Sequence, residues 1–191
     1  MSPSPLSAAD RTALLAVARG AVLHHLGLGP APVLPEGGPL AVSRGAFVTL
    51  RLDGQLRGCI GTFQPLGTLA RTAAAMAVRA ASEDPRFPPV RAEEAGRLRY
   101  RISALGPSRP VSGLAEVEVG RHGLLVRKGW HRGALLPAVA VEQGWDRATF
   151  LRHACLKAGL SPDAWRDSDA VVEVFEAEEF GDEPEDRRED R

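Results

Sequence analysis

Residues 45–63 read GAFVTLRLDGQLRGCIGTF, two runs of apolar and β-branched residues that are separated by Asp53-Gly54. An Asp-Gly pair between such runs is a strong hairpin signal, because a type I′ turn requires positive φ at both central residues. We therefore predict a β-hairpin in this stretch, and the rest of the chain is considered relative to it.

A two-residue turn sets the expected register of the hairpin. Leu52 would lie opposite Gln55, and Val48 opposite Cys59. Successive side chains of a strand point to opposite faces, so Cys59 would share a face with Gln55 and Arg57. The other face would carry three apolar side chains, namely Phe47, Leu56 and Ile60. The face with Cys59 is then the better candidate to line a cleft, and a bulge at a glycine would reverse this assignment.

The second run contains two glycines, Gly58 and Gly61, on either side of Cys59 and Ile60. Glycine inside a strand costs backbone entropy and provides no side chain for packing. The pair therefore indicates a bulge, or a place where another backbone or a ligand approaches closely.

Cys59 permits two interpretations. A cationic neighbour such as Arg57 favours the thiolate, which is the reactive form of cysteine. Free cysteine is also among the most buried residue types and often acts only as a small apolar side chain. The residues alone leave both interpretations open.

The motif LRGCIG at residues 56–61 resembles the signature of the AMMECR family, called AmmeMemoRadiSam system protein A in prokaryotes. The resemblance continues in the same order through further segments and covers roughly residues 10–178. These segments are DPRFPP at 84–89, GLL at 123–125, RG at 132–133 with LP at 136–137, and GW at 144–145 through KAGL at 157–160. One departure is Arg101, near which the family typically has an acidic residue.

The resemblance implies an α+β fold with mostly antiparallel sheets flanked by helices. It implies a larger lobe with both termini, a smaller lobe, and a cleft between them toward which the 56–61 side chains point. Residues 6–178 would form this single domain of two interleaved lobes. Cys59 and Arg57 are then the candidate catalytic residues. The candidate binding residues are Leu56, Gly58, Ile60, Gly61, Asp84, Arg86 and Phe87.

Two functional hypotheses follow. In the first, the protein acts with a MEMO-type protein and a radical S-adenosylmethionine enzyme in a modification pathway, with RNA or protein as the substrate. Cys59 would be its nucleophile or thiol carrier, with His131 or His122 as base. In the second, the protein is a non-catalytic module that binds protein or RNA, and Cys59 is structural. The family association alone does not establish chemistry.

Composition limits the other classes of protein. Hydrophobic residues make up 44% of the 191 residues and charged residues 25%, typical of a globular chain. Two cysteines provide neither a disulfide framework, nor zinc-ligand spacing, nor the three-cysteine set of a radical enzyme. We therefore expect no cofactor and no metal. No apolar run is long enough to span a bilayer, and we expect a cytoplasmic protein.

The remaining chain shows patterns of both helix and strand. Helices are predicted after Ser7 and after Thr68, each of which is a suitable N-cap, and from Asp146 to Ala158, followed by Gly159. Residues 161–165 begin a short helix. Strands are predicted at 97–102, 116–119, 124–126, 134–136 and 171–176.

Charge is distributed unevenly along the chain. The formal net charge is zero, but residues 176–191 carry −6. We predict that residues 179–191 form a disordered acidic tail, and that removing 180–191 changes the free energy of unfolding by less than about 0.5 kcal/mol. Arg97, Arg99 and Arg101 alternate with apolar residues, which puts one basic face on that strand, either to meet phosphates or as an ordinary solvated surface.

Overall fold

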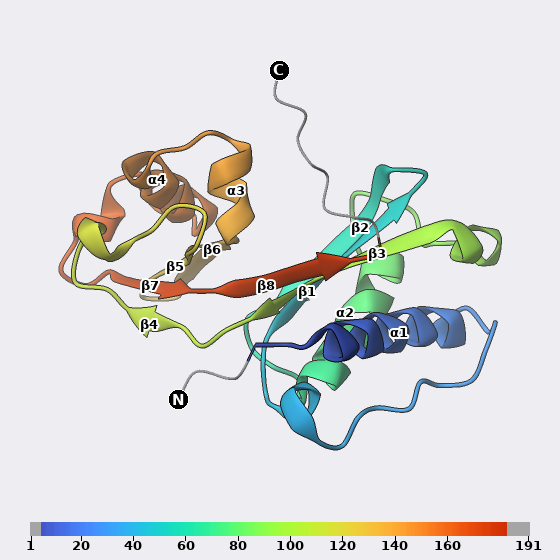
Figure 1. Ribbon diagram of the computed structural model, residues 1–191. Coiled ribbons are helices and arrows are strands. Elements are labelled where there is room, and N and C mark those ends of the chain that lie inside the picture. The colour runs from blue at the N-terminus through green and yellow to red at the C-terminus, as the bar shows by residue number, and fades with distance from the viewer. Residues whose placement is uncertain (1–4, 183–191) are drawn as a thin grey trace. The chain divides into compact units, whose positions relative to one another are not determined.

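The computed structural model describes residues 5–182, and the chain folds as two compact units (Figure 1). Of the described residues, one unit contains 5–105 and 178–182, and the other contains Gly106–Ala177. Each unit has its own four-stranded antiparallel sheet and its own apolar core. This confirms the prediction of an α+β fold with antiparallel sheets.

The first unit contains the hairpin and both long N-terminal helices. Its sheet has the strand order β2-β1-β3-β8. The helices are α1 (Ala8–His25) and α2 (Leu69–Ser82), and the strands are β1 (Ala46–Leu52), β2 (Gln55–Thr62), β3 (Leu98–Leu105) and β8 (Ala177–Gly181). Two short 3₁₀ segments, η1 (Gly38–Ala41) and η2 (Ala92–Arg97), lie in the connections.

The helix starts were predicted correctly from their caps. The Ser7 hydroxyl accepts a hydrogen bond from the Asp10 N–H, and the Asp10 carboxylate accepts the Ser7 N–H, which completes a capping box. Thr68 caps α2 in the same way through the N–H of Arg71. Both helices pack against the sheet (Figure 1). The core between them includes the fully buried side chains Leu14, Val48, Leu50, Met76, Tyr100 and Ile102.

Strand β8 was not predicted, and it lies partly in the stretch that we assigned to a disordered tail. Phe180 packs against the core of the first unit, and Glu178 accepts a hydrogen bond from buried Arg44. The Asp182 N–H donates to Tyr100 O, which joins the end of β8 to β3. The prediction of a disordered tail is therefore wrong for residues 179–182, and the predicted tolerance to removal of residues 180–191 stays a prediction that these contacts argue against. Residues 183–191 lie outside the described part.

The second unit has the strand order β4-β7-β5-β6. Its strands are β4 (Arg109–Pro110), β5 (Gly123–Lys128), β6 (His131–Leu135) and β7 (Val171–Phe175). Its helical segments are η3 (Leu114–Glu116), α3 (Pro137–Glu142), α4 (Arg147–Lys157) and η4 (Ala164–Arg166). The helix predicted at Asp146–Ala158 is α4, for which Asp146 is the N-cap, and the short helix expected at 161–165 is the 3₁₀ turn η4. Phe150, Ala154 and Cys155 of α4 are fully buried in this unit's core.

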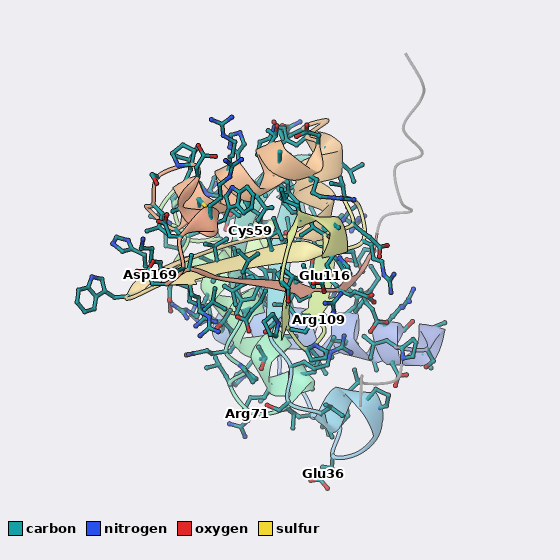
Figure 2. The ribbon with its side chains drawn as sticks, turned by 90° about the vertical axis from the view of Figure 1, so that its left-hand side faces the viewer. Glu36, Cys59, Arg71, Arg109, Glu116 and Asp169 are labelled. Atoms are coloured by element: carbon teal, nitrogen blue, oxygen red, sulfur yellow. The ribbon has the colours of Figure 1, made fainter. Side chains whose placement is uncertain are left out.

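The strand predicted at residues 116–119 is absent. Glu116 ends η3 instead, where its carboxylate accepts the Ser112 N–H and pairs with Arg109 at 2.9 Å (Figure 2). Val117 donates its N–H back to Leu114 O, so this segment makes local turns. The alternation of Glu and Val therefore reflects one buried side chain, Val117, beside exposed acids.

Among residues 5–182, no helix combines the length and the apolar character that crossing a membrane requires.

Candidate functional site

The hairpin has the predicted turn but a different register. Asp53 and Gly54 have φ of 50° and 79°, as a type I′ turn requires, and Leu52 lies opposite Gln55. The register then shifts, because Arg51 pairs with Leu56 while Leu50 pairs with Gly58. Arg57 is thus the extra residue of a β-bulge. The predicted pairing of Cys59 with Val48 is wrong, since Cys59 lies opposite Thr49.

The bulge changes the neighbours of Cys59. Thr49 shares a face of the sheet with Cys59, and its hydroxyl donates a hydrogen bond to Cys59 Sγ at 3.2 Å. Ile60 pairs with Val48 and packs against the helix-covered core, so it does not share a face with Phe47 as predicted. Cys59, labelled in Figure 2, is only partly buried. Its thiol therefore lies on the face of the sheet that the two helices do not cover.

The backbone of Cys59 is held from outside the sheet. Strand β2 is an edge strand, and edge strands have N–H groups without a partner strand. The Cys59 N–H donates to Asp84 Oδ2 at 2.8 Å. Asp84 follows α2 directly, and its side chain is only 2% exposed. The segment beginning at Asp84 thus fastens to β2 at the cysteine.

The same carboxylate binds Arg86. Arg86 donates from its backbone N and from Nε to Asp84 Oδ1, and from Nη2 to Oδ2 at 2.7 Å. These side-chain hydrogen bonds, together with the Cys59 N–H, hold the pKa of Asp84 well below its usual range. The pKa of Arg86 is raised, chiefly by its hydrogen bonds to Asp84 and additionally by its electrostatic interaction with Cys59. Arg86 is therefore a cation within electrostatic range of the Cys59 sulfur.

Arg57 makes other contacts. Its Nε and Nη2 donate to the two oxygens of Glu94 at 3.0 Å each, and its Nη groups donate to the carbonyls of Pro88 and Pro89. Hydrogen bonding to Arg57 is the main cause of the lowered pKa of buried Glu94. Arg57 thus connects the bulge to the 84–89 segment and to η2. Its assignment as thiolate stabiliser or anion clamp stays a prediction, because its guanidinium is engaged by Glu94 and by two backbone carbonyls.

The two glycines of the motif contact the chain itself. A Cβ on Gly58 would lie 2.1 Å from Ala80 O in α2, and a Cβ on Gly61 would lie 2.1 Å from the Phe47 ring. Gly58 therefore allows the close approach of another backbone, which was one of the two predicted explanations. The predicted bulge is also present, at Arg57, directly before Gly58. Direct binding of a ligand by either glycine stays a prediction.

The other candidate residues lie close to these. Leu56 is exposed beside the bulge. Phe87 donates its N–H to Asp84 O, and its ring lies 5.5 Å from the guanidinium carbon of Arg86. Ile60 belongs to the core side. The structure therefore brings Cys59, Asp84, Arg86 and Phe87 together.

The histidines considered as bases belong to the second unit. His122 is buried, and its Nδ1 accepts the N–H of Glu118. Nδ1 of His131 lies 3.2 Å from Ala158 O. Within residues 5–182, no group of three His, Cys, Asp or Glu side chains is placed to hold a metal ion.

Sequence reasoning missed Thr49 and the proximity of Arg86 to the thiol. Thr49 was missed because the predicted register put Val48 opposite Cys59. The alternation of apolar Val48 and Leu50 with polar Thr49 and Arg51 is the sequence signal that could have placed Thr49 on the face away from the core. Arg86 could be placed only through the long-range contact between Asp84 and Cys59.

Comparison with known proteins agrees with this architecture. Residues 15–180 match the AMMECR1 family. Protein MK0488 of Methanopyrus kandleri is 43% identical over 180 residues, which is 89% of this chain and 87% of that protein. A protein of Thermococcus gammatolerans is 44% identical over 89% of each chain. The crystal structure of the uncharacterized protein PH0010 from Pyrococcus horikoshii is similar with a TM-score of 0.80 and 40% identity, covering 89% of this chain and 90% of that one.

Proposed function

The chain belongs to the AMMECR1 family, and we propose that it presents Cys59 as a nucleophile or thiol carrier in a modification pathway. In this pathway it acts with a MEMO-type protein and a radical S-adenosylmethionine enzyme on an RNA or protein substrate. The observation that carries the thiol role is the pair of hydrogen bonds at Cys59. Thr49 donates to its sulfur, and its own N–H is fixed by the Asp84–Arg86 pair.

This environment suits a reactive thiol better than a packing residue. A hydroxyl that donates to sulfur and a guanidinium nearby both stabilise the negative charge that develops on the sulfur when it reacts. Cys155 provides the contrast within the same chain, since it is fully buried in the core and burial raises the pKa of its thiol. In the proposed chemistry the thiol proton leaves to solvent, and the sulfur electron pair bonds to an electrophilic carbon of the substrate. The bond between that carbon and the leaving group breaks, and the leaving group departs with the electron pair of this bond.

The test is the pH dependence of Cys59 alkylation by iodoacetamide in the native protein, with Cys155 as the buried internal control. We expect Cys59 to react at neutral pH, and Thr49→Val or Arg86→Ala to shift its rate profile toward higher pH. Arg79→Ala is the matched control, because Arg79 forms an exposed pair with Glu83 in the same unit. Absence of Cys59 reaction until the protein unfolds would reject the thiol role and favour a binding module with a structural cysteine.

The partnership is tested separately. The three proteins of one genome would be co-expressed and purified through a tag on this chain. We expect the Cys59→Ser variant to recover its partners as well as the wild type does, because serine preserves the shape of the strand. Failure of the wild type to recover either partner would reject the pathway assignment and leave the thiol chemistry standing.

A further inference from the structure

Three arginines lie on the face of the sheet that carries Cys59. Arg51 of β1 pairs directly with Arg99 of β3, and Arg101 follows two residues later on β3. Directly paired residues of antiparallel strands project to the same face, and residues i and i+2 share a face. The intervening Tyr100 is buried on the helix side. All three arginines line one shallow hollow together with Gly181.

The register connects this arginine cluster, Arg51, Arg99 and Arg101, to the thiol. Thr49 pairs with Cys59 on one side and with Arg101 on the other, so these three residues form one row across β2, β1 and β3. Neighbouring strands are about 4.8 Å apart, which puts the Cα atoms of Cys59 and Arg101 about 10 Å apart. Thr49 is small, and an arginine side chain can extend over it toward the sulfur.

Within residues 5–182, none of these three arginines forms an ion pair. Arg51 donates one hydrogen bond to Gly54 O, and Arg101 remains partly buried. Nearby arginines differ, because Arg57 pairs with Glu94, Arg86 with Asp84, and Arg97 with Asp53. Arg97 was predicted to belong to the same basic face, but it lies in η2, and Arg51 takes its place. The cluster therefore concentrates positive charge that nearby carboxylates do not balance.

The dimensions of the cluster indicate its ligand. Adjacent strands and an i to i+2 step separate the three residues by only about 5–7 Å. Guanidinium groups bind phosphate oxygens through paired N–H donors. Backbone positions this close allow three flexible arginine side chains to converge on one phosphate or pyrophosphate group at the surface, whereas the cluster is too short to follow the backbone of a polymer.

We propose that Arg51, Arg99 and Arg101 bind the phosphate or pyrophosphate group of a small phosphorylated substrate whose reacting end lies at Cys59. The assignment of Cys59 as the reacting end rests on the proposed function, whereas phosphate binding by the arginines does not. The cluster would select the substrate and orient it, and the thiol would act on it.

The first experiment measures binding of inorganic pyrophosphate by isothermal titration calorimetry. We expect wild type to bind more weakly as the salt concentration increases, and Arg99→Gln with Arg101→Gln to reduce affinity at least tenfold. Arg97→Gln is the matched control, because Arg97 already pairs with Asp53, and it should bind like wild type. Arg99→Gln alone is included because the Arg99 side chain is exposed and its replacement should not disturb folding. This single variant should also bind pyrophosphate more weakly than wild type. Equal binding by all variants would overturn the proposal.

A second probe distinguishes the sources of phosphate. A single-stranded oligoribonucleotide is titrated under the same conditions. Binding of the oligonucleotide with no binding of pyrophosphate would overturn the small-molecule assignment in favour of RNA. Binding of pyrophosphate at least as tight as that of the oligonucleotide, per site and at the same salt concentration, supports it.

The link to Cys59 is tested with two alkylating reagents of similar shape. Iodoacetate is an anion and iodoacetamide is neutral, so unbalanced arginines should favour iodoacetate selectively. We expect the rate ratio to fall at least threefold in the double variant, and pyrophosphate to slow iodoacetate more than iodoacetamide. An equal ratio of the iodoacetate rate to the iodoacetamide rate in wild type and the double variant would show that the arginine cluster does not act on a ligand at Cys59. The Cys59→Ser variant should still bind pyrophosphate, so failure of the thiol function and failure of the phosphate site give different results.

Discussion

Gly58 shows how a residue without a side chain determines the position of the functional one beside it. The missing Cβ lets the carbonyl of Ala80 in α2 approach the strand, and this contact positions β2 against the helix. Arg57, immediately before Gly58, is the bulged residue, so the chain changes face between the turn and Cys59. Cys59 lies beside Thr49 because of both features.

We expect Gly58→Ala to destabilise the protein by about 2–3 kcal/mol, because the new methyl group overlaps backbone that cannot rotate away. Gly96→Ala is the control, since a Cβ there meets no atom within 4 Å, and it should change the free energy of unfolding by less than about 0.5 kcal/mol. Urea unfolding monitored by circular dichroism measures both variants. Equal stability of the two variants would show that the α2–β2 contact is not this close.

The pH dependence of stability should report on Asp84. Its pKa is depressed in the folded protein because Arg86 donates to its carboxylate, so the carboxylate stabilises the fold above the unfolded pKa of about 3.9. That contribution is lost as the pH falls through the lower folded pKa. Asp84→Asn should therefore cost about 1–3 kcal/mol at pH 5–7, and the difference from wild type should shrink below about pH 4.

Denaturant unfolding of both proteins at pH 7, 5 and 3 measures this difference. Glu83→Gln is the control, because its carboxylate belongs to an exposed pair with Arg79 and should contribute less than about 1 kcal/mol. A difference between wild type and Asp84→Asn that grows on acidification would contradict the assignment.

Among the elements, β8 differs most from its sequence pattern. The segment AEEFG contains one large apolar residue between acids, and such a composition favours a solvated tail. The strand forms because Phe180 reaches the core, where Arg11 also lies 5.7 Å from its ring, and because β3 supplies hydrogen-bond partners. These partners are distant in sequence, and local patterns do not include them.

Phe180→Ala should lower the free energy of unfolding by about 2 kcal/mol, less than the 3–5 kcal/mol typical of fully buried phenylalanine, because Phe180 is partly exposed. Val33→Ala is a suitable control, since Val33 is 91% exposed in the same unit. Thermal or urea unfolding distinguishes the two variants. If Phe180→Ala is as stable as Val33→Ala, then β8 does not hold the sheet edge.

For the whole molecule, the sequence correctly predicted the turns and helix starts, which depend on interactions between neighbouring residues. The Asp53-Gly54 turn, the helices capped by Ser7 and Thr68, and the helix near Asp146 were all predicted correctly, because each depends on a few neighbouring residues. The register at Cys59 and strand β8 depend on contacts with segments distant in sequence. For the candidate site, the residue types were predictable from the motifs, whereas the contacts of Thr49 and Asp84 with Cys59, and the link to Arg86 through Asp84, required the fold.

Each unit contains one cysteine, so thiol labelling can report on the two units separately. Cys59 is partly buried in the first unit, and Cys155 is fully buried in the core of the second. Burial raises the pKa of Cys155, which lowers its thiolate fraction at neutral pH and adds to the steric protection. A disulfide reagent such as 5,5′-dithiobis(2-nitrobenzoate) should therefore find one reactive thiol in the native protein.

Cys155 should react only at urea concentrations that unfold residues 106–177. The Cys59→Ser variant should show no rapidly reacting thiol, and Cys155→Ala should retain one, which assigns the rapid reaction. Two thiols reacting at equal rates in native wild type would mean that the core around Phe150 and Cys155 opens readily. Because such opening exposes a fully packed helix face, it would also lower the urea midpoint of this unit, and that midpoint provides an independent check.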